Sequence, residues 1–115
     1  GFGDRVDPIS GKRRFHSGLD LAPGLGSRVV AAQSGKVTFA GKHAGYGNLI
    51  ILDHGNGLTT WYGHLEQILV KNHAVVKKGD LIGKVGATGR VTGPHLHFEV
   101  RLNNKPQNPL LYLVP

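Results

Sequence analysis

Glycine and proline interrupt this chain so often that a long helix has no room to form. Its 115 residues include 18 Gly and 6 Pro, and Val, Ile and Leu stand between them in short runs. Short apolar runs bounded by turn-forming residues are typical of β-strands. The sequence therefore predicts an all-β fold, a small antiparallel sheet or sandwich, and the length fits one domain over residues 1–115.

The clearest local signal is a hairpin at the centre of the chain. Two apolar strands, 49–54 and 58–64, flank the turn Gly-Asn-Gly at 55–57, and turns of this composition favour tight hairpins. Further strands are expected at 29–32 and 36–41, and after the turn at 76–80. A last hairpin turn is expected at 103–106, and a helical turn over 66–70.

A strand near the end of the chain carries the most distinctive side chains. Residues 93–100 read GPHLHFEV, and successive side chains of a strand point to opposite faces. One face then holds His95, His97 and Glu99, and the other holds Leu96, Phe98 and Val100. The sequence thus predicts one packed face and one face that carries chemistry, with Glu99 as an acceptor for an imidazole N–H.

Metal binding is the chemistry that the histidines suggest. The chain has no Cys, so a metal site must use His, Asp or Glu, and catalytic zinc takes three such ligands and leaves a position for water. The remaining imidazoles could orient that water, stabilise an oxyanion or move protons. Spacing alone leaves open which of His95 and His97 binds the metal. The candidates are His16, Asp20, His64, His95 and His97.

The charge balance narrows the choice of partners. Lys and Arg number 14 against 7 Asp and Glu, for a net charge of +7, which favours encounter with a polyanion. Nucleic acid is not expected, because the basic residues are scattered and aromatic residues are not interleaved with them. No apolar run is long enough to span a membrane. Because the chain opens without a signal-like segment, we expect a domain cut or matured from a longer protein.

Three motifs together resemble a known family. They are the His16-x-x-x-Asp20 spacing, YGHL at 62–65 and GPHLHFE at 93–99. In this order they resemble the LytM/lysostaphin-type zinc metalloendopeptidases of bacterial cell walls, and the similarity runs from about Gly3 to Leu113. The resemblance implies one zinc ion per domain. Its ligands would be His16, Asp20 and His97, while His64 and His95 would act on the water and the transition state.

The same resemblance implies a fold of the duplicated hybrid motif type, with a long narrow groove that accepts an extended peptide of peptidoglycan. Glycine-cutting relatives carry a tyrosine shortly before the first zinc histidine, whereas the first tyrosine here is Tyr46. This departure favours cleavage of D-alanyl-meso-diaminopimelate cross-links. Residues 3–8 resemble the Gram-negative envelope branch, which implies the periplasm or cell envelope and, as partners, upstream regulatory domains or envelope adaptor proteins.

Several side chains have more than one interpretation. Tyr46 and Asn48, in a glycine-flanked loop, and Arg90 and Thr92, in the loop before the last motif, are candidate substrate contacts. Trp61 and Tyr62 could line the substrate groove, but on a hairpin beside alternating Leu and Ile one of them is expected in the core. The other histidines match no motif and are expected at the surface or in turns; they are His43, His54 and His73.

Three alternative functions stay open at this point. The chain could cut glycyl-glycine bonds, or it could be a degenerate module that activates a cell-wall amidase without hydrolysing anything. The turn at 76–83 also resembles turns of lipoyl-type and phosphocarrier domains. That last alternative is disfavoured, because no lysine has the expected Asp-Lys attachment context.

Overall fold

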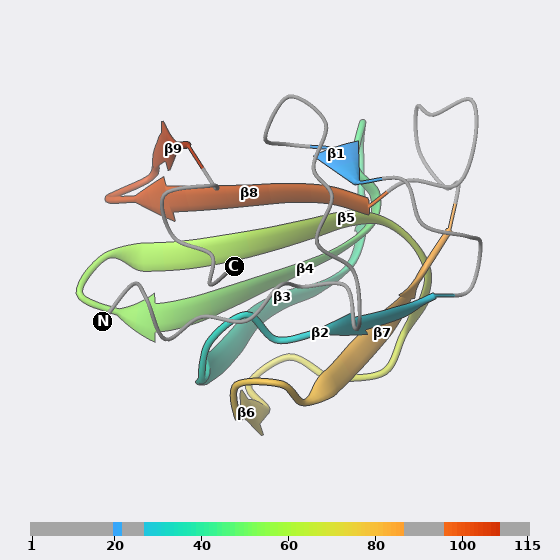
Figure 1. Cartoon of the computed structure of the whole chain (residues 1–115), viewed down its shortest axis with the longest axis horizontal. Helices are drawn as coiled ribbons and strands as arrows, with labels where there is room; N and C mark the ends of the chain where they lie inside the picture. The colour runs from blue at the N-terminus through green and yellow to red at the C-terminus, as the bar shows by residue number, and fades with distance from the viewer. Residues whose placement is uncertain (1–19, 22–26, 87–95, 109–115) are drawn as a thin grey trace.

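Antiparallel strands dominate the fold. The structure, a computed structural model, describes residues 20–21, 27–86 and 96–108, and these contain strands but no helix (Figure 1). Within this part of the chain no helix could cross a membrane. The all-β prediction is confirmed. The strands are β1 (Asp20–Leu21), β2 (Arg28–Val30), β3 (Gly35–His43), β4 (Gly47–Gly55), β5 (Leu58–Ile68), β6 (Val75–Val76), β7 (Leu81–Val85), β8 (Leu96–Leu102) and β9 (Lys105–Gln107).

The long strand β5 organises the sheet. The strand order is β1-β8-β5-β4-β3-β6, all pairs are antiparallel, and β9 pairs with β8. The first part of β5 pairs with β8, whereas its last residues pair with β7, which also pairs with β2. The strands β2 and β7 therefore run across one face of the sheet formed by β3, β4, β5 and β8, as Figure 1 shows.

The central hairpin is confirmed. β4 and β5 are joined by Asn56 and Gly57, whose φ angles are 55° and 82°. Two consecutive positive φ angles match the right-handed twist of the flanking strands, and Asn-Gly adopts them at low cost. The turn between β8 and β9 has the same character at Asn103 and Asn104, with φ angles of 52° and 64°.

The helical turn expected over 66–70 is wrong. β5 continues through Ile68, and its end pairs with β7 in the register Gln67 to Lys84 and Ile68 to Gly83. The close approach needs glycine, because a Cβ on Gly83 would lie 2.8 Å from the carbonyl oxygen of Gln67. Backbone hydrogen bonds to a strand distant in sequence outweigh the weak local helix preference of this segment.

The core lies between the main sheet and the β2–β7 pair. Leu96, Phe98 and Val100 of β8 are buried, and the residues between them face the other way. Tyr62 is fully buried with its ring 5.4 Å from that of Phe98, whereas Trp61 is only half-buried on the opposite face. The predicted two-faced strand and the predicted core aromatic are both confirmed. The core includes Val29, Val37, Ile50, Leu52, Leu65, Ile82, Val85, Leu96, Phe98 and Val100.

A chain of hydrogen bonds crosses the edge of this core. His54 bonds the carbonyl oxygen of Ser34 at 2.8 Å through Nδ1, and Thr60 Oγ1 at 2.7 Å through Nε2. Thr60 Oγ1 lies 2.7 Å from the hydroxyl of Tyr62, which accepts from the amide of Ala32 at 3.0 Å. His54, expected at the surface, is thus half-buried and joins β4 and β5 to the segment before β3.

Thr60 is the central link of this chain and is fully buried. Thr60→Val keeps the shape but removes the hydroxyl, so His54 and Tyr62 each lose a partner. We expect a loss of about 1–3 kcal/mol in the free energy of unfolding, measured by urea denaturation. Thr60→Ser, which keeps the hydroxyl, should lose less. Equal stability of the valine variant and the unchanged protein would contradict the importance of this hydrogen-bond chain.

Candidate active site

Two of the predicted site residues meet on neighbouring strands. The register of β1 and β8 pairs Asp20 with His97, and the register of β5 and β8 pairs Gly63 with His97. Asp20 is placed by its backbone alone. Residues that are directly opposite in an antiparallel pair are the closest cross-strand neighbours. His97 is therefore the point at which β1, β8 and β5 bring predicted site residues together.

His64 reaches this point through an irregularity in β5. Asn48 pairs with Leu65 and Ile50 with Tyr62, so two residues of β5 stand against one of β4. His64, one of those two, has a φ of 61°. Such a bulge re-aims a side chain and is frequent beside active sites. Because of it, Tyr62 and Leu65 are both fully buried although they are three residues apart.

The bulge brings two imidazoles together. The ring centroids of His64 and His97 are 5.8 Å apart, with the rings edge to face at 67°. His64 is 7% exposed, and its backbone is fixed on both sides. Its amide donates to the carbonyl oxygen of Tyr46 at 2.7 Å, and its carbonyl oxygen accepts from the amide of Gly86 at 3.1 Å.

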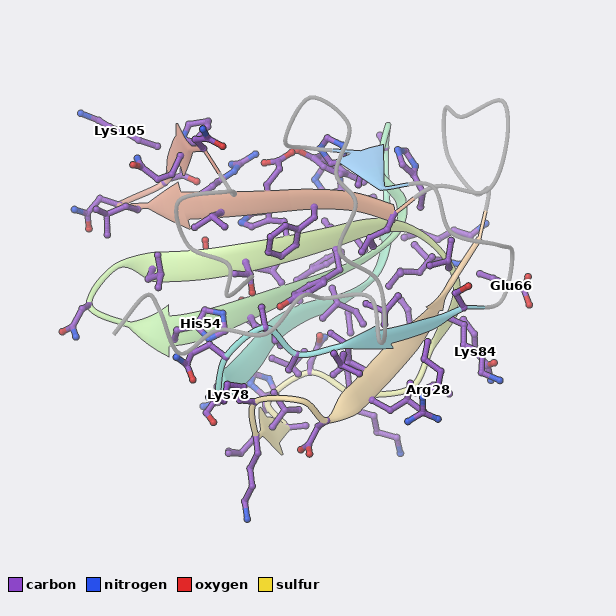
Figure 2. The ribbon with its side chains drawn as sticks, in the orientation of Figure 1. Arg28, His54, Glu66, Lys78, Lys84 and Lys105 are labelled. Carbon is purple, nitrogen blue, oxygen red and sulfur yellow. The ribbon has the colours of Figure 1, made fainter. Side chains whose placement is uncertain are left out.

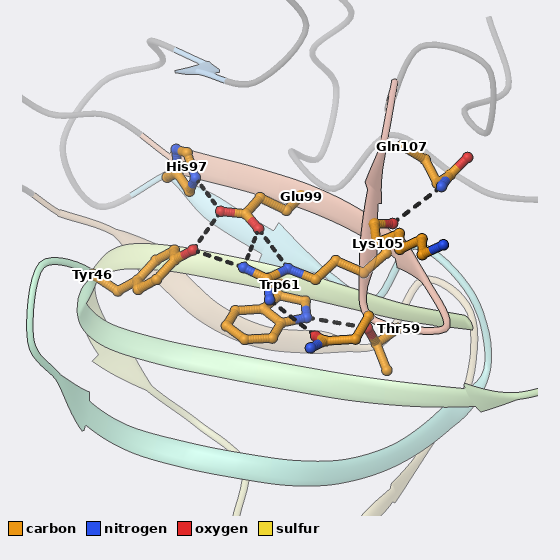
Figure 3. A network of polar contacts seen from close by, with 9 residues as sticks. Tyr46, Thr59, Trp61, His97, Glu99, Lys105 and Gln107 are labelled. Atoms are coloured by element: carbon orange, nitrogen blue, oxygen red, sulfur yellow. Dashed lines mark hydrogen bonds and ion pairs between the residues drawn. The ribbon is translucent and has the colours of Figure 1, made fainter. Parts of the chain in front are cut away.

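Glu99 is the centre of a polar cluster beside His97 (Figure 3). Its Oε2 lies 2.6 Å from Nε2 of His97 and accepts from the Tyr46 hydroxyl at 2.6 Å. Its Oε1 accepts from Nε of Arg101 at 2.9 Å. This geometry agrees with the prediction that Glu99 accepts a hydrogen bond from an imidazole N–H.

The environment keeps Glu99 ionised. Burial by itself raises the pKa of Glu99, but the hydrogen bonds from His97, Tyr46 and Arg101 outweigh burial and lower that pKa to about 2. An ionised carboxylate only accepts hydrogen bonds, so Nε2 of His97 is the donor. In the neutral ring the lone pair is then on Nδ1. Burial and the neighbouring Glu99 together raise the pKa of Tyr46, which keeps its hydroxyl protonated as a donor.

Arg101 holds the other side of Glu99. Its guanidinium carbon lies 3.7 Å from the ring centroid of Trp61, and its terminal nitrogens reach Glu99, Asn104 and the Tyr46 oxygen at 2.9, 3.1 and 3.2 Å. This combination of stacking and a charged pair fixes the guanidinium in one orientation. The sequence analysis missed Arg101. The alternation that placed His97 and Glu99 on one face, extended by two residues, would have found it.

Of the predicted substrate contacts, Tyr46 belongs to this cluster and Asn48 lies at the bulge. The Tyr46 ring lies 5.5 Å from that of His97 and 5.6 Å from that of Trp61. Asn48 donates from Nδ2 to the carbonyl oxygen of Leu65 at 2.9 Å, across the bulge. Four other predicted site residues lie outside the described part of the chain, namely His16, Arg90, Thr92 and His95.

Comparison with known proteins identifies the family. The family model described as "Peptidase family M23" matches residues 14–109, which is most of the chain. The chain belongs to peptidase family M23.

Relatives within M23 include proteins with named activities. The chain is 44% identical over 114 residues to the DD-carboxypeptidase/endopeptidase Mpg of Neisseria meningitidis, and 44% identical over 102 residues to the peptidoglycan DD-endopeptidase ShyB of Vibrio cholerae. These alignments cover 99% and 89% of this chain. The chain spans only 26% and 24% of those relatives.

A solved structure supports the fold. A zinc-containing peptidase from Vibrio cholerae matches with a TM-score of 0.79 and 41% identity, over 98% of this chain and 35% of that one. An M23 domain of this all-β type is thus shown. The long narrow groove stays a prediction, because loops expected to border it include residues 87–95, outside the described ranges.

The donor set fits the zinc that the M23 family implies. Metal-bound histidines typically donate their second ring N–H to a carboxylate, and His97 donates Nε2–H to Glu99 in this way. Within residues 20–21, 27–86 and 96–108, no three His, Cys, Asp or Glu side chains form a metal-binding group. Two of the residues needed for one, His16 and His95, lie outside these ranges.

Trp61 is the only tryptophan of the chain, so its fluorescence reports on the Arg101 contact. Arg101→Gln removes the stacked cation and leaves the partly buried Glu99 without its ion pair. We expect a red-shifted emission and a loss of about 1–3 kcal/mol in the free energy of unfolding. Lys105→Gln, at an exposed position, is the control and should change neither. Unchanged emission in Arg101→Gln would show that the contact is absent in solution.

Proposed function

We propose that this chain is a zinc-dependent endopeptidase domain that hydrolyses peptide cross-links of bacterial peptidoglycan, with the D-alanyl-meso-diaminopimelate bond as the bond that it cleaves. The observation that carries the proposal is the meeting of Asp20, His64 and His97 at one point of the sheet of an M23 chain. The names of Mpg and ShyB support an endopeptidase that acts on peptidoglycan.

One zinc ion per domain would be held by His16, Asp20 and His97. A bound zinc ion acts as a Lewis acid and lowers the pKa of its water to about 7. Glu99 supports this role of His97, because its hydrogen bond to Nε2 presents Nδ1 as the basic nitrogen. The register of Asp20 opposite His97 supports a shared site for both.

His64 and His95 would handle protons and developing negative charge. His64 is suited to this role because its backbone is fixed at both peptide groups and its ring packs edge to face with that of His97. A preorganised imidazole can donate to an oxyanion or pass a proton to the leaving amine at little cost in reorganisation. The substrate would lie along this outer face as an extended peptide, in contact with residues that include Asn48, Arg90 and Thr92.

The proposed substrate implies where the domain acts and which partners it has. An enzyme that cleaves peptidoglycan works outside the cytoplasm, in the periplasm or cell envelope. The chain spans about a quarter of Mpg and ShyB, so upstream regulatory domains or envelope adaptor proteins are its proposed partners.

The decisive experiment uses purified cross-linked muropeptide dimers and the zinc-loaded domain, with products analysed by mass spectrometry. Metal-dependent appearance of monomers, lost with a chelator and restored by zinc, supports the proposal and locates the scissile bond. Cleavage of glycine bridges alone would show that the substrate is the glycyl-glycine bond and not the proposed cross-link. No cleavage of either substrate, together with stimulation of an amidase, would replace the enzyme with a non-hydrolytic activator.

In the same assay we expect His64→Ala to bind zinc normally and to lose about 100-fold or more in turnover, because general acid–base groups contribute about 10²–10⁴-fold. The matched control is His73→Ala. His73 also has a positive φ, 76°, but is exposed in a turn, so the control tests the effect of alanine in that backbone conformation. Substantial activity in His64→Ala would refute the assigned role.

The basic surface gives a second prediction. Arg28 and Lys84 are register partners on β2 and β7, and their side chains, like those of Lys78 and Lys105, extend away from the ribbon in Figure 2. With a net charge of +7, attraction to anionic peptidoglycan should weaken as salt is added. Activity on whole sacculi should therefore fall more between low and high salt than activity on a small soluble muropeptide. Equal losses would rule out this attraction.

A further inference from the structure

Tyr46 contacts two histidines of the predicted site through different atoms: His64, a predicted catalytic residue, and His97, a predicted zinc ligand. It ends the turn between β3 and β4, and its amide closes that turn on the carbonyl oxygen of His43 at 3.1 Å. Its own carbonyl oxygen accepts the amide of His64 at 2.7 Å. Its ring lies 5.5 Å from that of His97. One residue of a turn is thus in contact with a bulge in β5 and with β8.

Gly63 makes room for this arrangement. It is the register partner of His97, and a Cβ at this position would lie 3.0 Å from Cδ1 of Tyr46 and 3.5 Å from Cβ of His97. The Tyr46 ring therefore occupies the space that a side chain at position 63 would take. Trp61 covers another side of the ring, with centroids 5.6 Å apart.

The hydroxyl of Tyr46 has a defined direction. It accepts from a terminal nitrogen of Arg101 at 3.2 Å and donates to Oε2 of Glu99 at 2.6 Å. The same Oε2 receives Nε2 of His97 at 2.6 Å. Since Arg101 binds the other oxygen, the hydroxyl of Tyr46 keeps Oε2 directed at the imidazole (Figure 3).

We propose that Tyr46 is a positioning residue that fixes two histidines of the site, His64 through its carbonyl oxygen and His97 through the hydrogen bond of its hydroxyl to Glu99. This inference rests on the proposed function for its consequence in catalysis, and on the geometry alone for its effect on the His97 ring. It replaces the interpretation of Tyr46 as a substrate contact. A positioning residue changes the tautomer and metal affinity of His97, whereas a substrate contact changes the affinity for peptide.

The first test is Tyr46→Phe, which removes only the hydroxyl and keeps the ring and the carbonyl oxygen. In the metal-free domain, ¹⁵N NMR of the imidazole of His97 should show a larger population protonated on Nδ1. Zinc affinity, measured by competition with a chelator, should fall about tenfold, the lower end of the effect of such outer partners. In turnover, kcat should fall while KM stays unchanged.

The matched control is Tyr62→Phe. Its hydroxyl also makes hydrogen bonds, one with the Thr60 hydroxyl and one accepted from the amide of Ala32, but on the core side of the sheet. This variant should lose stability and leave the tautomer of His97 and the zinc affinity unchanged. An unchanged tautomer and zinc affinity in Tyr46→Phe, or a raised KM alone, would overturn the inference.

A double-mutant cycle tests whether the hydroxyl acts through Glu99. Glu99→Gln alone should lower zinc affinity by about 10–100-fold. If Tyr46 acts through that carboxylate, Tyr46→Phe should have no further effect in the Glu99→Gln background. Independent, additive losses would overturn this route.

The outcomes separate the two proposals. A domain that shows the Tyr46-dependent tautomer but cleaves no muropeptide refutes the proposed function and supports the inference. A domain that cleaves muropeptides in a zinc-dependent manner, but whose His97 tautomer ignores Tyr46→Phe, refutes the inference and supports the proposed function.

Discussion

Both the core and the site depend on how β5 passes from Tyr62 to Leu65. Strict alternation would place these two residues on opposite faces, yet both are fully buried. The left-handed backbone of His64, with a φ of 61°, absorbs the difference. A non-glycine residue in this region costs about 1–3 kcal/mol and persists only where its surroundings determine it. Here the hydrogen bonds from its amide to Tyr46 and from Gly86 to its carbonyl oxygen do so.

The alternation of β5 before the bulge serves both faces of the sheet. On the core face, Thr60 and Tyr62 continue the hydrogen-bond chain from His54. On the outer face, Trp61 supports the guanidinium of Arg101. Each network joins segments distant in sequence. In each, hydrogen bonds offset the free-energy cost of burying polar groups. The outer network carries a charge, Glu99, whose ionisation depends on three hydrogen-bonding neighbours.

Local patterns predicted much of this architecture. The central hairpin followed from its Gly-Asn-Gly turn, and the two faces of β8 followed from period-two alternation, including the acceptor role of Glu99. The prediction of a helical turn over 66–70 failed because pairing with β7 decides the structure there, and the local sequence does not reveal that pairing. The sequence did not predict the bulge at His64 for the same reason, because a bulge is defined by the pairing of β5 with β4.

The site was predictable only in part because its geometry is a matter of cross-strand register. Alternation alone could extend the outer face of β8 from His97 and Glu99 to Arg101. Trp61 joins them because it is the register partner of Glu99, which no spacing along the chain reveals. Tyr46 is further removed, since it enters from a turn through the space that Gly63 leaves open. The glycine beside the histidine in YGHL is thus the one local sign that another part of the chain approaches the site closely.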